Sequence, residues 1–309
     1  MERLDGGAAV PAPYRGGIVA LGNFDGFHAG HQAVVGKAIA RARAEQRPAL
    51  VATFDPHPAR FFRPDLPPFR LTDLDQRQAL LAEAGADAML VFNFDAAFAA
   101  VTAAEFVTDH LASRIGAAGV VTGEDFTFGK DRSGTVETLK LLGQANRMSV
   151  DIATSVTDAE GVISSTRIRE ALAAGDCATA TRLLTRPYAI RGAVEHGDKR
   201  GRALGFPTAN MGLGDYLRPR FGVYAVRVRL PDGKAAQGVA NLGVRPMFAD
   251  GREILESWLF DFDGDLYGQC LEVALIARIR DEQHFDGLEA LVAQVRRDAE
   301  MARQLLAMG

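Results

Sequence analysis

The sequence predicts an α/β domain built on a parallel sheet, followed by a smaller all-β barrel that ends in a helix. Strand-like and helix-like runs alternate through the first half of the chain, which is typical of a parallel sheet covered by helices. Short strand-like runs separated by turns fill most of the second half, and a length of 309 residues suits about two domains. We place the boundary at Thr185-Arg186-Pro187, which gives domains of residues 1–186 and 187–309.

The first half contains the elements of the parallel sheet and its helices. Apolar runs predict strands at residues 17–21, 49–54, 88–94, 119–123 and 149–156. Helix-like runs lie at residues 31–45, 72–84, 102–115 and 135–147. Thr102 followed by Glu105 has the pattern of a capping box, and Thr135 begins another expected helix. Ligands of such sheets bind beyond the carboxyl ends of the strands, so we expect the binding loops at residues 23–31, 55–58, 124–134 and 161–169.

The second half has the pattern of a barrel with helices before and after it. Helices are expected at residues 165–173, 178–184 and 288–306, and strands at residues 188–195, 222–229, 236–242, 253–260 and 270–279. Asp-Gly pairs such as Asp232-Gly233 and Asp263-Gly264 mark turns between several of these strands. Residues 1–15 are expected to form a short, loosely ordered lead-in, not a secretory signal.

Composition argues against several classes of partner. The net charge is −4, so the chain lacks the basic footprint that broad nucleic-acid binding requires. No apolar run is long enough to cross a membrane. Cys177 and Cys270 lie far apart without metal-ligand spacing, which suits two reduced thiols in a cytoplasmic protein. We expect no nucleic-acid partner, no membrane partner and at most weak or transient self-association.

Residues 21–32, Leu-Gly-Asn-Phe-Asp-Gly-Phe-His-Ala-Gly-His-Gln, carry the most specific signal in the chain. His28 and His31 stand where an expected strand passes into a helix, and a helix N-terminus favours phosphate through its unpaired N–H groups. Imidazole donors there can bind phosphoryl oxygens and neutralise charge as a diphosphate leaves. The alternative is a glycine-rich turn with a surface histidine, but two framed histidines favour nucleotide chemistry. The expected phosphate-binding residues are Gly22, Asn23, Phe24, His28, Gly30 and His31.

Further loops at the same sheet edge have residue types that suit a nucleotide and a planar heterocycle. Two prolines stiffen the loop at residues 53–58, and the loop at residues 123–134 combines carboxylates with aromatic and basic groups. The expected heterocycle contacts are Asp55, Asp125, Phe126 and Phe128. Hydroxyl groups and arginines at a helix start suit a triphosphate, and they occur at Ser164, Ser165, Thr166, Arg167 and Arg169. Taken singly, each loop would also fit a surface turn or a helix cap.

These groups indicate a reaction class. The chain lacks a Gly-Lys-Ser/Thr phosphate-binding loop and shows no Ser-His-Asp or Cys-His order. Phosphates surrounded by histidines and arginines, without an obvious nucleophile, suit direct in-line transfer. A phosphate oxygen of one substrate would attack the α-phosphate of ATP, and pyrophosphate would leave. Such catalysis consists mainly of positioning and charge neutralisation.

A second dense motif, residues 196–210, lies in the barrel half. Glycines, basic residues and a proline suit a loop that wraps phosphates, at Gly197, Lys199, Gly201, Gly205 and Pro207. Thr208 and Asn210 are two residues apart, so their side chains share a face in extended backbone. Two neutral oxygens facing one point can hold Mg²⁺ together with waters and phosphate oxygens. The alternative is a glycine-rich hairpin with solvent-facing polar residues.

Other barrel residues suit a substrate that carries a hydroxyl group. Glu256 lies within an expected strand and could accept the proton of an attacking hydroxyl, although a glutamate in a strand is often only a solvent-facing position. Asn241 and Arg245 belong to an expected substrate-side loop. Arg280, Asp281, Glu282 and Phe285 follow the last expected strand, where they would form a lid.

The motifs together resemble those of the bifunctional bacterial riboflavin kinase/FAD synthetase family over nearly the whole chain after residue 15. The resemblance rests on residues 22–31, 53–58, 123–126, 164–169, 205–210 and 261–268. It implies a nucleotidyltransferase-like (Rossmann-like) first domain that adenylylates FMN with ATP, giving FAD and pyrophosphate. It also implies a riboflavin kinase barrel that converts riboflavin and ATP to FMN. The expected small-molecule partners are ATP, riboflavin, FMN and FAD, with Mg²⁺ as the metal.

The resemblance also implies residue roles. Thr208 and Asn210 match the family's magnesium and ATP site, and Glu256 matches the glutamate that activates the ribityl 5′-hydroxyl. Near the nucleotide and the flavin phosphate, the matching residues are Asn23, His28, His31, Asp125 and Arg169. We expect Glu256, His28, His31 and Arg169 to be catalytic. Thr127, Met247 and Trp258 depart from the residues that the family often has at these positions.

Two other functions stay open. The first domain alone would also fit a cytidylyltransferase or a pantetheine-phosphate adenylyltransferase, although neither needs a separate kinase-like barrel. The second alternative is a flavin-binding regulatory protein with inactive sites. The presence of every expected catalytic side chain argues against that alternative.

Overall fold

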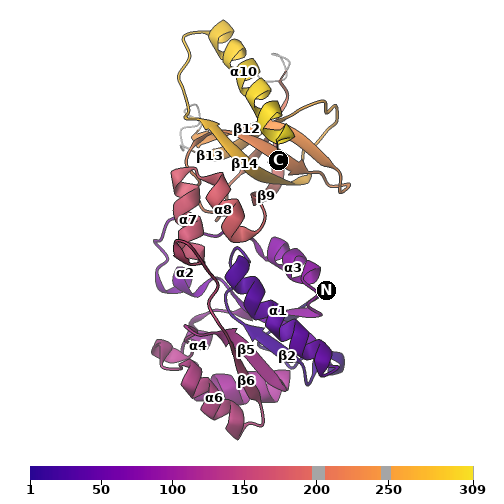
Figure 1. Ribbon diagram of the computed structural model, residues 1–309, viewed down its shortest axis with the longest axis vertical. Coiled ribbons are helices and arrows are strands. Elements are labelled where there is room, and N and C mark those ends of the chain that lie inside the picture. The colour runs from indigo at the N-terminus through magenta and orange to yellow at the C-terminus, as the bar shows by residue number, and fades with distance from the viewer. Residues whose placement is uncertain (197–205, 245–251, 309) are drawn as a thin grey trace. The chain divides into compact units, whose positions relative to one another are not determined.

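The computed structural model describes residues 1–196, 206–244 and 252–308, and the chain forms two compact units (Figure 1). The first unit comprises Met1–Leu66 and Leu74–Ser164. The second comprises Pro67–Asp73, which we call the strap, together with the chain from Ser165 onwards. The second unit therefore includes a short segment from within the first unit's sequence and the helices that precede the barrel. Our boundary at residues 186 and 187, where we expect the two activities to separate, stays a prediction.

The first unit is built on the predicted parallel sheet. Its six strands are β1 (Glu2–Asp5), β2 (Ile18–Leu21), β3 (Ala49–Asp55), β4 (Ala88–Asn93), β5 (Gly119–Gly123) and β6 (Ser149–Ala153). They lie in the order β1-β4-β3-β2-β5-β6, and all pairs are parallel. The strand order reverses at β2, which pairs with β3 on one side and β5 on the other. Such a reversal opens a crevice at the carboxyl ends of the strands, where ligands bind.

Helices cover both faces of this sheet (Figure 1). The core on one face includes Val35 and Ala38 of α1 (Ala29–Ala44) and Leu81 of α3 (Leu74–Glu83). The core on the other face includes Leu111 of the π-helix η2 (Phe106–Ile115) and Leu139 of α6 (Val136–Ala145). The shorter elements of this unit are η1 (Ala12–Tyr14), α2 (Pro58–Phe62), α4 (Ala96–Ala99), α5 (Ala103–Glu105), η3 (Lys130–Arg132), β7 (Thr157–Asp158) and β8 (Gly161–Val162).

The amino-terminal segment differs from its prediction. The expectation of a loosely ordered lead-in is wrong, because β1 pairs with β4 along the edge of the sheet. The Tyr14 hydroxyl donates to Glu2 at 2.9 Å, and Val10 is buried in the core. Most of β1 is polar and exposed, as an edge strand permits. The sequence therefore has no apolar run that would predict a strand at this position.

One predicted helix changes type along its length. The capping box of Thr102 and Glu105 is present as predicted, and α5 begins there. From Phe106 the chain continues as a π-helix to Ile115, and Gly116 ends it with a left-handed φ of 65°. The spacing of apolar residues did not distinguish these two helix types, because both bury one side of the segment.

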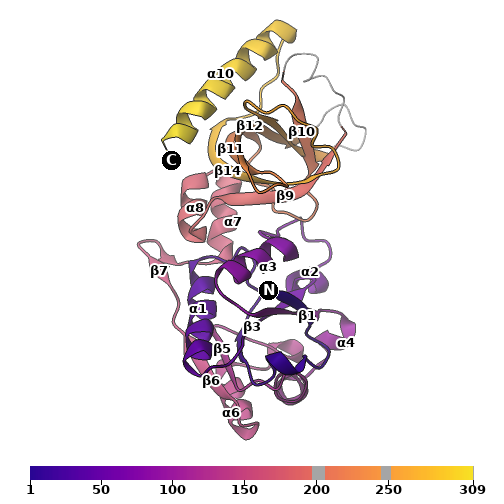
Figure 2. The ribbon, with the colours of Figure 1, turned by 90° about the vertical axis from the view of Figure 1, so that its right-hand side faces the viewer.

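The second unit contains the predicted barrel, which is closed and antiparallel (Figure 2). Its strands are β9 (Tyr188–Glu195), β10 (Thr208–Gly212), β11 (Gly222–Arg229), β12 (Ala235–Val244), β13 (Glu253–Leu259) and β14 (Cys270–Arg280). Around the barrel they follow the order β10-β13-β12-β11-β14-β9. The helices α7 (Ser165–Ala174) and α8 (Cys177–Leu184) precede the barrel. The last helix, α10 (Leu288–Ala307), packs Ala299 and Ala302 against Val239 on the outside of the barrel.

Backbone hydrogen bonds hold the strap against the barrel. The Arg70 N–H donates to the Asp215 carbonyl at 3.1 Å, and the Leu217 N–H donates to the Arg70 carbonyl at 2.8 Å. Arg191 of β9 adds an ion pair with Asp73, with Nη1 3.6 Å from Oδ2. The strap is therefore part of the barrel unit, although helices of the first unit flank it in the sequence.

Candidate functional site

The motif of residues 21–32 forms the loop from β2 into α1. His28 is the N-cap of α1, and its Nδ1 accepts hydrogen bonds from the backbone N–H groups of Gly30 at 3.1 Å and His31 at 3.4 Å. The imidazole rings of His28 and His31 stack with their centroids 3.6 Å apart. Because Nδ1 of His28 accepts, the ring proton of the neutral imidazole lies on Nε2. The cap therefore leaves His28 with an N–H donor at the amino end of a helix.

Two phenylalanines hold this loop in an unusual backbone conformation. Phe24 and Phe27 have left-handed φ values of 51° and 42°, which are uncommon for bulky residues. Both rings are buried in the core beneath α1, and this packing offsets the backbone strain. Gly30 has little space around it, because an added Cβ would lie 3.0 Å from the His28 ring and 3.3 Å from the Ile163 carbonyl. The loop is thus fixed by packing as well as by the histidine cap.

Beneath the loop lies a buried polar network that the sequence analysis missed. Arg77 of α3 donates to the Thr53 hydroxyl at 2.9 Å, and Thr53 donates to the Asn23 carbonyl at 2.8 Å. Asp25 and Arg77 are only 2% and 4% exposed, and they form an ion pair. Asp25 stands inside the recognised motif, but Arg77 had no signal beyond being a basic residue on an expected helix. The network joins α3, β3 and the loop, which makes these residues positioning groups.

The other predicted residues of the first unit lie at the same edge of the sheet. Asp55 ends β3, and Asp125 and Phe126 follow β5, so their strands flank β2 on either side. The buried Oδ1 of Asn23 has no hydrogen-bond partner among the residues that the structure describes. Phe128 is buried against Phe106 and stacks on Phe126 with centroids 5.7 Å apart. Of this aromatic pair, Phe126 is therefore the more accessible to a ligand.

The serine and arginine motif is divided between the two units. Ser164 ends the first unit, and Ser165, Thr166, Arg167 and Arg169 belong to α7 of the second. Arg169 contacts the strap, because its Nε donates to the Phe69 carbonyl at 2.9 Å. Its guanidinium also lies 5.2 Å from the centre of the Phe69 ring. These contacts tie α7 to the strap within the barrel unit.

Three predicted kinase residues form a row across the outer surface of the barrel. In the strand register, Glu256 of β13 lies between Asn210 of β10 and Asn241 of β12. Residues that face each other across antiparallel strands project from the same face, so the three side chains share one surface. Thr208 lies two residues before Asn210 on that face and pairs with Trp258. The adjacent strand residues Ala209 and Leu255 are buried on the opposite, inner face.

Most of the predicted phosphate-binding residues that precede this row cannot be placed. Gly197, Lys199, Gly201, Gly205 and Arg245 lie outside the described residues. Pro207, the residue before β10, is exposed.

The predicted lid residues make specific contacts with the last helix. Arg280, at the end of β14, forms a bidentate pair with Asp298 of α10, including an Nη2–Oδ2 distance of 2.6 Å. The Arg280 guanidinium lies 5.8 Å from the centre of the Phe285 ring. Asn241 donates from Nδ2 to Oε1 of Glu282 at 3.2 Å. The segment after β14 therefore connects α10 to the strand beside Glu256.

Family comparison decides between the functions that the sequence left open. A family model described as FAD synthetase matches residues 11–167, and one described as Riboflavin kinase matches residues 184–306. The chain belongs to the bifunctional riboflavin kinase/FMN adenylyltransferase family. This finding confirms the resemblance that the motifs indicated.

Relatives in this family match along nearly their full length. The bifunctional riboflavin kinase/FMN adenylyltransferase of Escherichia coli (strain K12) is 42% identical over 299 residues, which cover 96% of this chain and 95% of the relative. The protein of the same name from Pseudomonas fluorescens is 42% identical over 296 residues, covering 95% and 94%. A crystal structure described as a macrolide-efflux protein from Streptococcus pneumoniae matches with a TM-score of 0.86 and 34% identity, covering 98% of this chain and 99% of that one.

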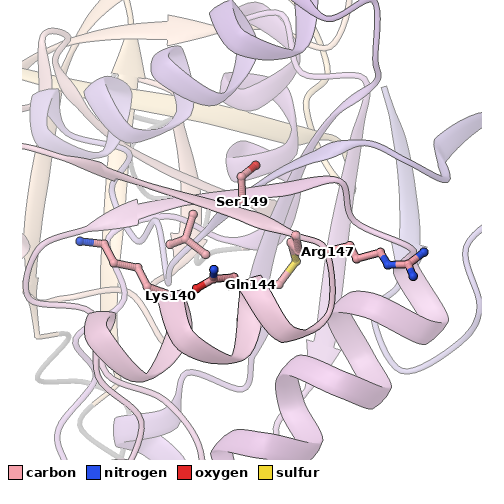
Figure 3. Close-up of a pocket in the computed structure, with 6 residues that line it drawn as sticks. Lys140, Gln144, Arg147 and Ser149 are labelled. Atoms are coloured by element: carbon pink, nitrogen blue, oxygen red, sulfur yellow. The ribbon is translucent and has the colours of Figure 1, made fainter.

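A pocket of about 340 Å³ lies elsewhere in the first unit, between α6 and β6 (Figure 3). It is lined in part by Lys140, Gln144, Arg147 and Ser149. Ser149 begins β6, so the pocket lies at the edge of the sheet opposite the family motifs. The Lys140 and Arg147 side chains extend in opposite directions in Figure 3, so their charges do not converge on one ligand.

Two searches of the described part of the chain bear on metals and membranes. Within it, no group of three or more His, Cys, Asp or Glu side chains is arranged to hold a metal ion. The oxygens of Thr208 and Asn210 fit a different kind of site, in which Mg²⁺ keeps several waters and binds substrate phosphates. Over the same residues, no helix is both long and apolar enough to cross a membrane.

Proposed function

We propose that this chain makes FMN from riboflavin and then FAD from FMN, using ATP in both steps. The observation that carries this conclusion is the match of two separate family models to the two halves of the chain. Each half also has its own cluster of motif residues, one at the sheet edge and one on the outer face of the barrel. Two sites with different residues support two reactions in sequence.

In the first unit, an oxygen of the FMN phosphate attacks the α-phosphate of ATP, and the bond to the departing pyrophosphate breaks. The Nε2–H of His28 and the imidazole of His31 bind the phosphate oxygens at the start of α1, where the helix dipole favours negative charge. Asn23 binds the nucleotide, and Asp125 and Phe126 contact the flavin. Arg169 and the hydroxyl groups at the start of α7 are the other proposed phosphate-binding groups.

In the barrel, Glu256 accepts the proton of the ribityl 5′-hydroxyl as its oxygen attacks the γ-phosphate of ATP, and ADP leaves. Thr208 and Asn210 hold Mg²⁺, whose chemistry is to neutralise phosphate charge. Asn210 supports this role because it is buried beside Glu256 in the strand register. Asn241, Arg280 and Phe285 lie on the flavin side of the site.

The test is to incubate the whole protein with riboflavin, ATP and Mg²⁺ and to separate the flavins by chromatography over time. FMN should appear first and FAD later, and removal of the metal with EDTA should stop phosphorylation. Glu256→Ala should stop FMN formation while FMN supplied directly is still converted to FAD, and His28→Ala should do the reverse. Folded protein that leaves riboflavin unchanged would exclude the proposal.

The setting of these reactions is part of the same proposal. We place the protein in the cytoplasm, with ATP and flavins as partners and at most weak self-association. The two cysteines support a reducing compartment, because Cys177 is buried, Cys270 is exposed and both are free thiols. Reduced thiols after purification under oxidising conditions, and an unchanged elution volume over a range of protein concentrations, would agree with this placement.

A further inference from the structure

The carboxylate of Glu282 lies against β12, beside the row formed by Asn210, Glu256 and Asn241. Its Oε1 accepts the hydrogen bond from Asn241. At Gly243, two residues farther along β12, an added Cβ would lie only 1.9 Å from the same Oε1. The carboxylate therefore occupies the space that a side chain at position 243 would fill.

Hydrogen bonds and ion pairs of Arg280 and Asp281, the two preceding residues, fix the segment that carries Glu282. Arg280 is anchored to Asp298, which is buried and also accepts from Gln294 at 2.8 Å. Arg280 donates from Nη1 to the Asp281 carbonyl at 2.8 Å. The Asp281 carboxylate in turn pairs with Arg278 and with Arg220. Glu282 is the next residue, so its position on β12 follows from an anchored backbone.

Asn241 links Glu282 to Glu256, the proposed general base, because it contacts the first and lies opposite the second. Asn241 and Glu256 face each other across β12 and β13, and directly opposed residues have Cβ atoms about 4.5–5.5 Å apart. A side-chain amide can turn over and exchange its donor and acceptor ends. A carboxylate accepts only, so Glu282 selects the orientation in which the amide donates to it. The amide then presents a defined set of groups beside Glu256.

We propose that Glu282 is a positioning residue of the kinase site, which holds the Asn241 amide in one orientation beside Glu256 for the flavin substrate. This inference rests on the proposed function of the barrel. The alternative role is a blocking group that must leave before riboflavin binds. Geometry favours positioning, because Gly243 pairs with Ile254, whereas Asn241 pairs with Glu256. The carboxylate therefore lies next to the Asn241–Glu256 pair instead of across it.

The test uses three variants of the full chain and one matched control. Glu282→Ala removes the carboxylate, Glu282→Gln keeps its shape and an accepting oxygen, and Gly243→Ala displaces the carboxylate without changing it. The control is Glu289→Ala, which alters an exposed glutamate in the first turn of α10. For each protein, kcat and KM are measured for riboflavin and for ATP, together with FMN adenylylation and Tm.

We expect Glu282→Ala and Gly243→Ala each to lower kcat/KM for riboflavin by about tenfold, as the loss of one charge-assisted hydrogen bond allows. KM for ATP, FMN adenylylation and Tm should stay close to their wild-type values, as should every parameter of Glu289→Ala. Glu282→Gln should recover most of the riboflavin activity.

Several results would overturn the inference. They are wild-type kinetics in Glu282→Ala, equal losses in the Ala and Gln variants, a lower riboflavin KM that indicates a blocking group, or a parallel fall in adenylylation and Tm. If wild-type protein does not phosphorylate riboflavin, the proposed function itself fails, and that result is distinct from all of these.

Discussion

Arg77 and Asp25 form a buried ion pair beneath the histidine loop, with Nη2 of Arg77 3.7 Å from Oδ1 of Asp25. Arg77 also binds Thr53, which binds the backbone of Asn23. A side chain of α3 therefore fixes the end of β3 and the loop that carries His28. The placement of the proposed phosphate-binding groups thus depends on a buried residue of another element.

Replacing Arg77 should damage the first unit selectively. Arg77→Met leaves the Asp25 carboxylate buried without this cation, so the free energy of unfolding should fall by about 3 kcal/mol, the usual scale for breaking a buried pair. FAD formation from FMN should also fall, because the loop loses its support, while riboflavin phosphorylation persists. Urea denaturation and the two activity assays measure these effects.

A double variant supplies the control for this pair. Asp25→Asn combined with Arg77→Met removes both charges, so it should be more stable than Arg77→Met alone. If the double variant is no more stable than the single one, the ion pair is not the cause of the loss.

Capping and phosphate binding by His28 should be separable. His28→Ala should cost about 1 kcal/mol of stability, because the first turn of α1 loses its cap. His28→Asn restores an accepting oxygen at the cap position but removes the imidazole donor. We therefore expect thermal unfolding near the wild-type temperature in His28→Asn, with FMN adenylylation still reduced by about a hundredfold or more. Recovery of both properties in His28→Asn would assign His28 a purely structural role.

His110 should make stability depend on pH in mildly acidic solution. Burial, with a further effect from the charge of Arg114, lowers the pKa of His110 below its ordinary value of 6.5. Its ring lies among Phe92, Phe98 and Phe106 in the core. As the pH falls below 6.5, the unfolded chain takes up a proton that the folded chain does not, so stability falls until the folded pKa is reached.

The measurement compares free energies of unfolding at pH 7.5 and pH 5.5. His110→Phe should show a smaller difference between the two than wild-type protein, whatever its absolute stability. His284→Ala is the matched control, because His284 is exposed and its loss should leave the difference unchanged. An unchanged difference in His110→Phe would contradict the assignment.

The stability of an isolated barrel fragment should depend on whether the fragment includes helix α8. Helix α8 buries Ala180, Leu183 and Leu184 within the second unit. A fragment of residues 187–309 lacks this helix, whereas a fragment of residues 165–309 keeps it. We expect the longer fragment to be more stable by about 3 kcal/mol or more, since burying one leucine contributes about 2 kcal/mol. Urea denaturation and riboflavin phosphorylation compare the two, and equal midpoints would show that α8 is dispensable.

The sequence predicted those parts of the molecule that local patterns encode. Apolar runs located β2, β3 and β5, and the motifs that follow them identified the edge of the sheet at which the loops gather. The two-residue spacing of Thr208 and Asn210 predicted their shared face on β10. These features are predictable because the two-residue period of a strand and the position of the loop after it depend on residues that are neighbours in the sequence.

Features that depend on distant partners were not predictable in this way. In the sequence, Arg77 is an ordinary basic residue of an expected helix, and only the structure shows that it pairs with Asp25. The strap has no pattern of its own that reveals a partner near Leu217, and polar β1 becomes a strand only through its pairing with β4. Glu282 was expected in a lid, but the sequence did not predict its contact with Asn241 or the space that Gly243 leaves for it. In each case the determining contact joins segments far apart in the chain.

The strap limits how such a protein can be recombined. Pro67–Asp73 is encoded between two parts of the first unit. Its hydrogen-bonding partners, Asp215 and Leu217, are encoded far downstream. A chimera that joins the front half of one homologue to the back half of another therefore exchanges the partners of this segment, even when the crossover falls cleanly between helices. Productive hybrids should need residues 67–73 and 213–217 to be inherited from the same parent.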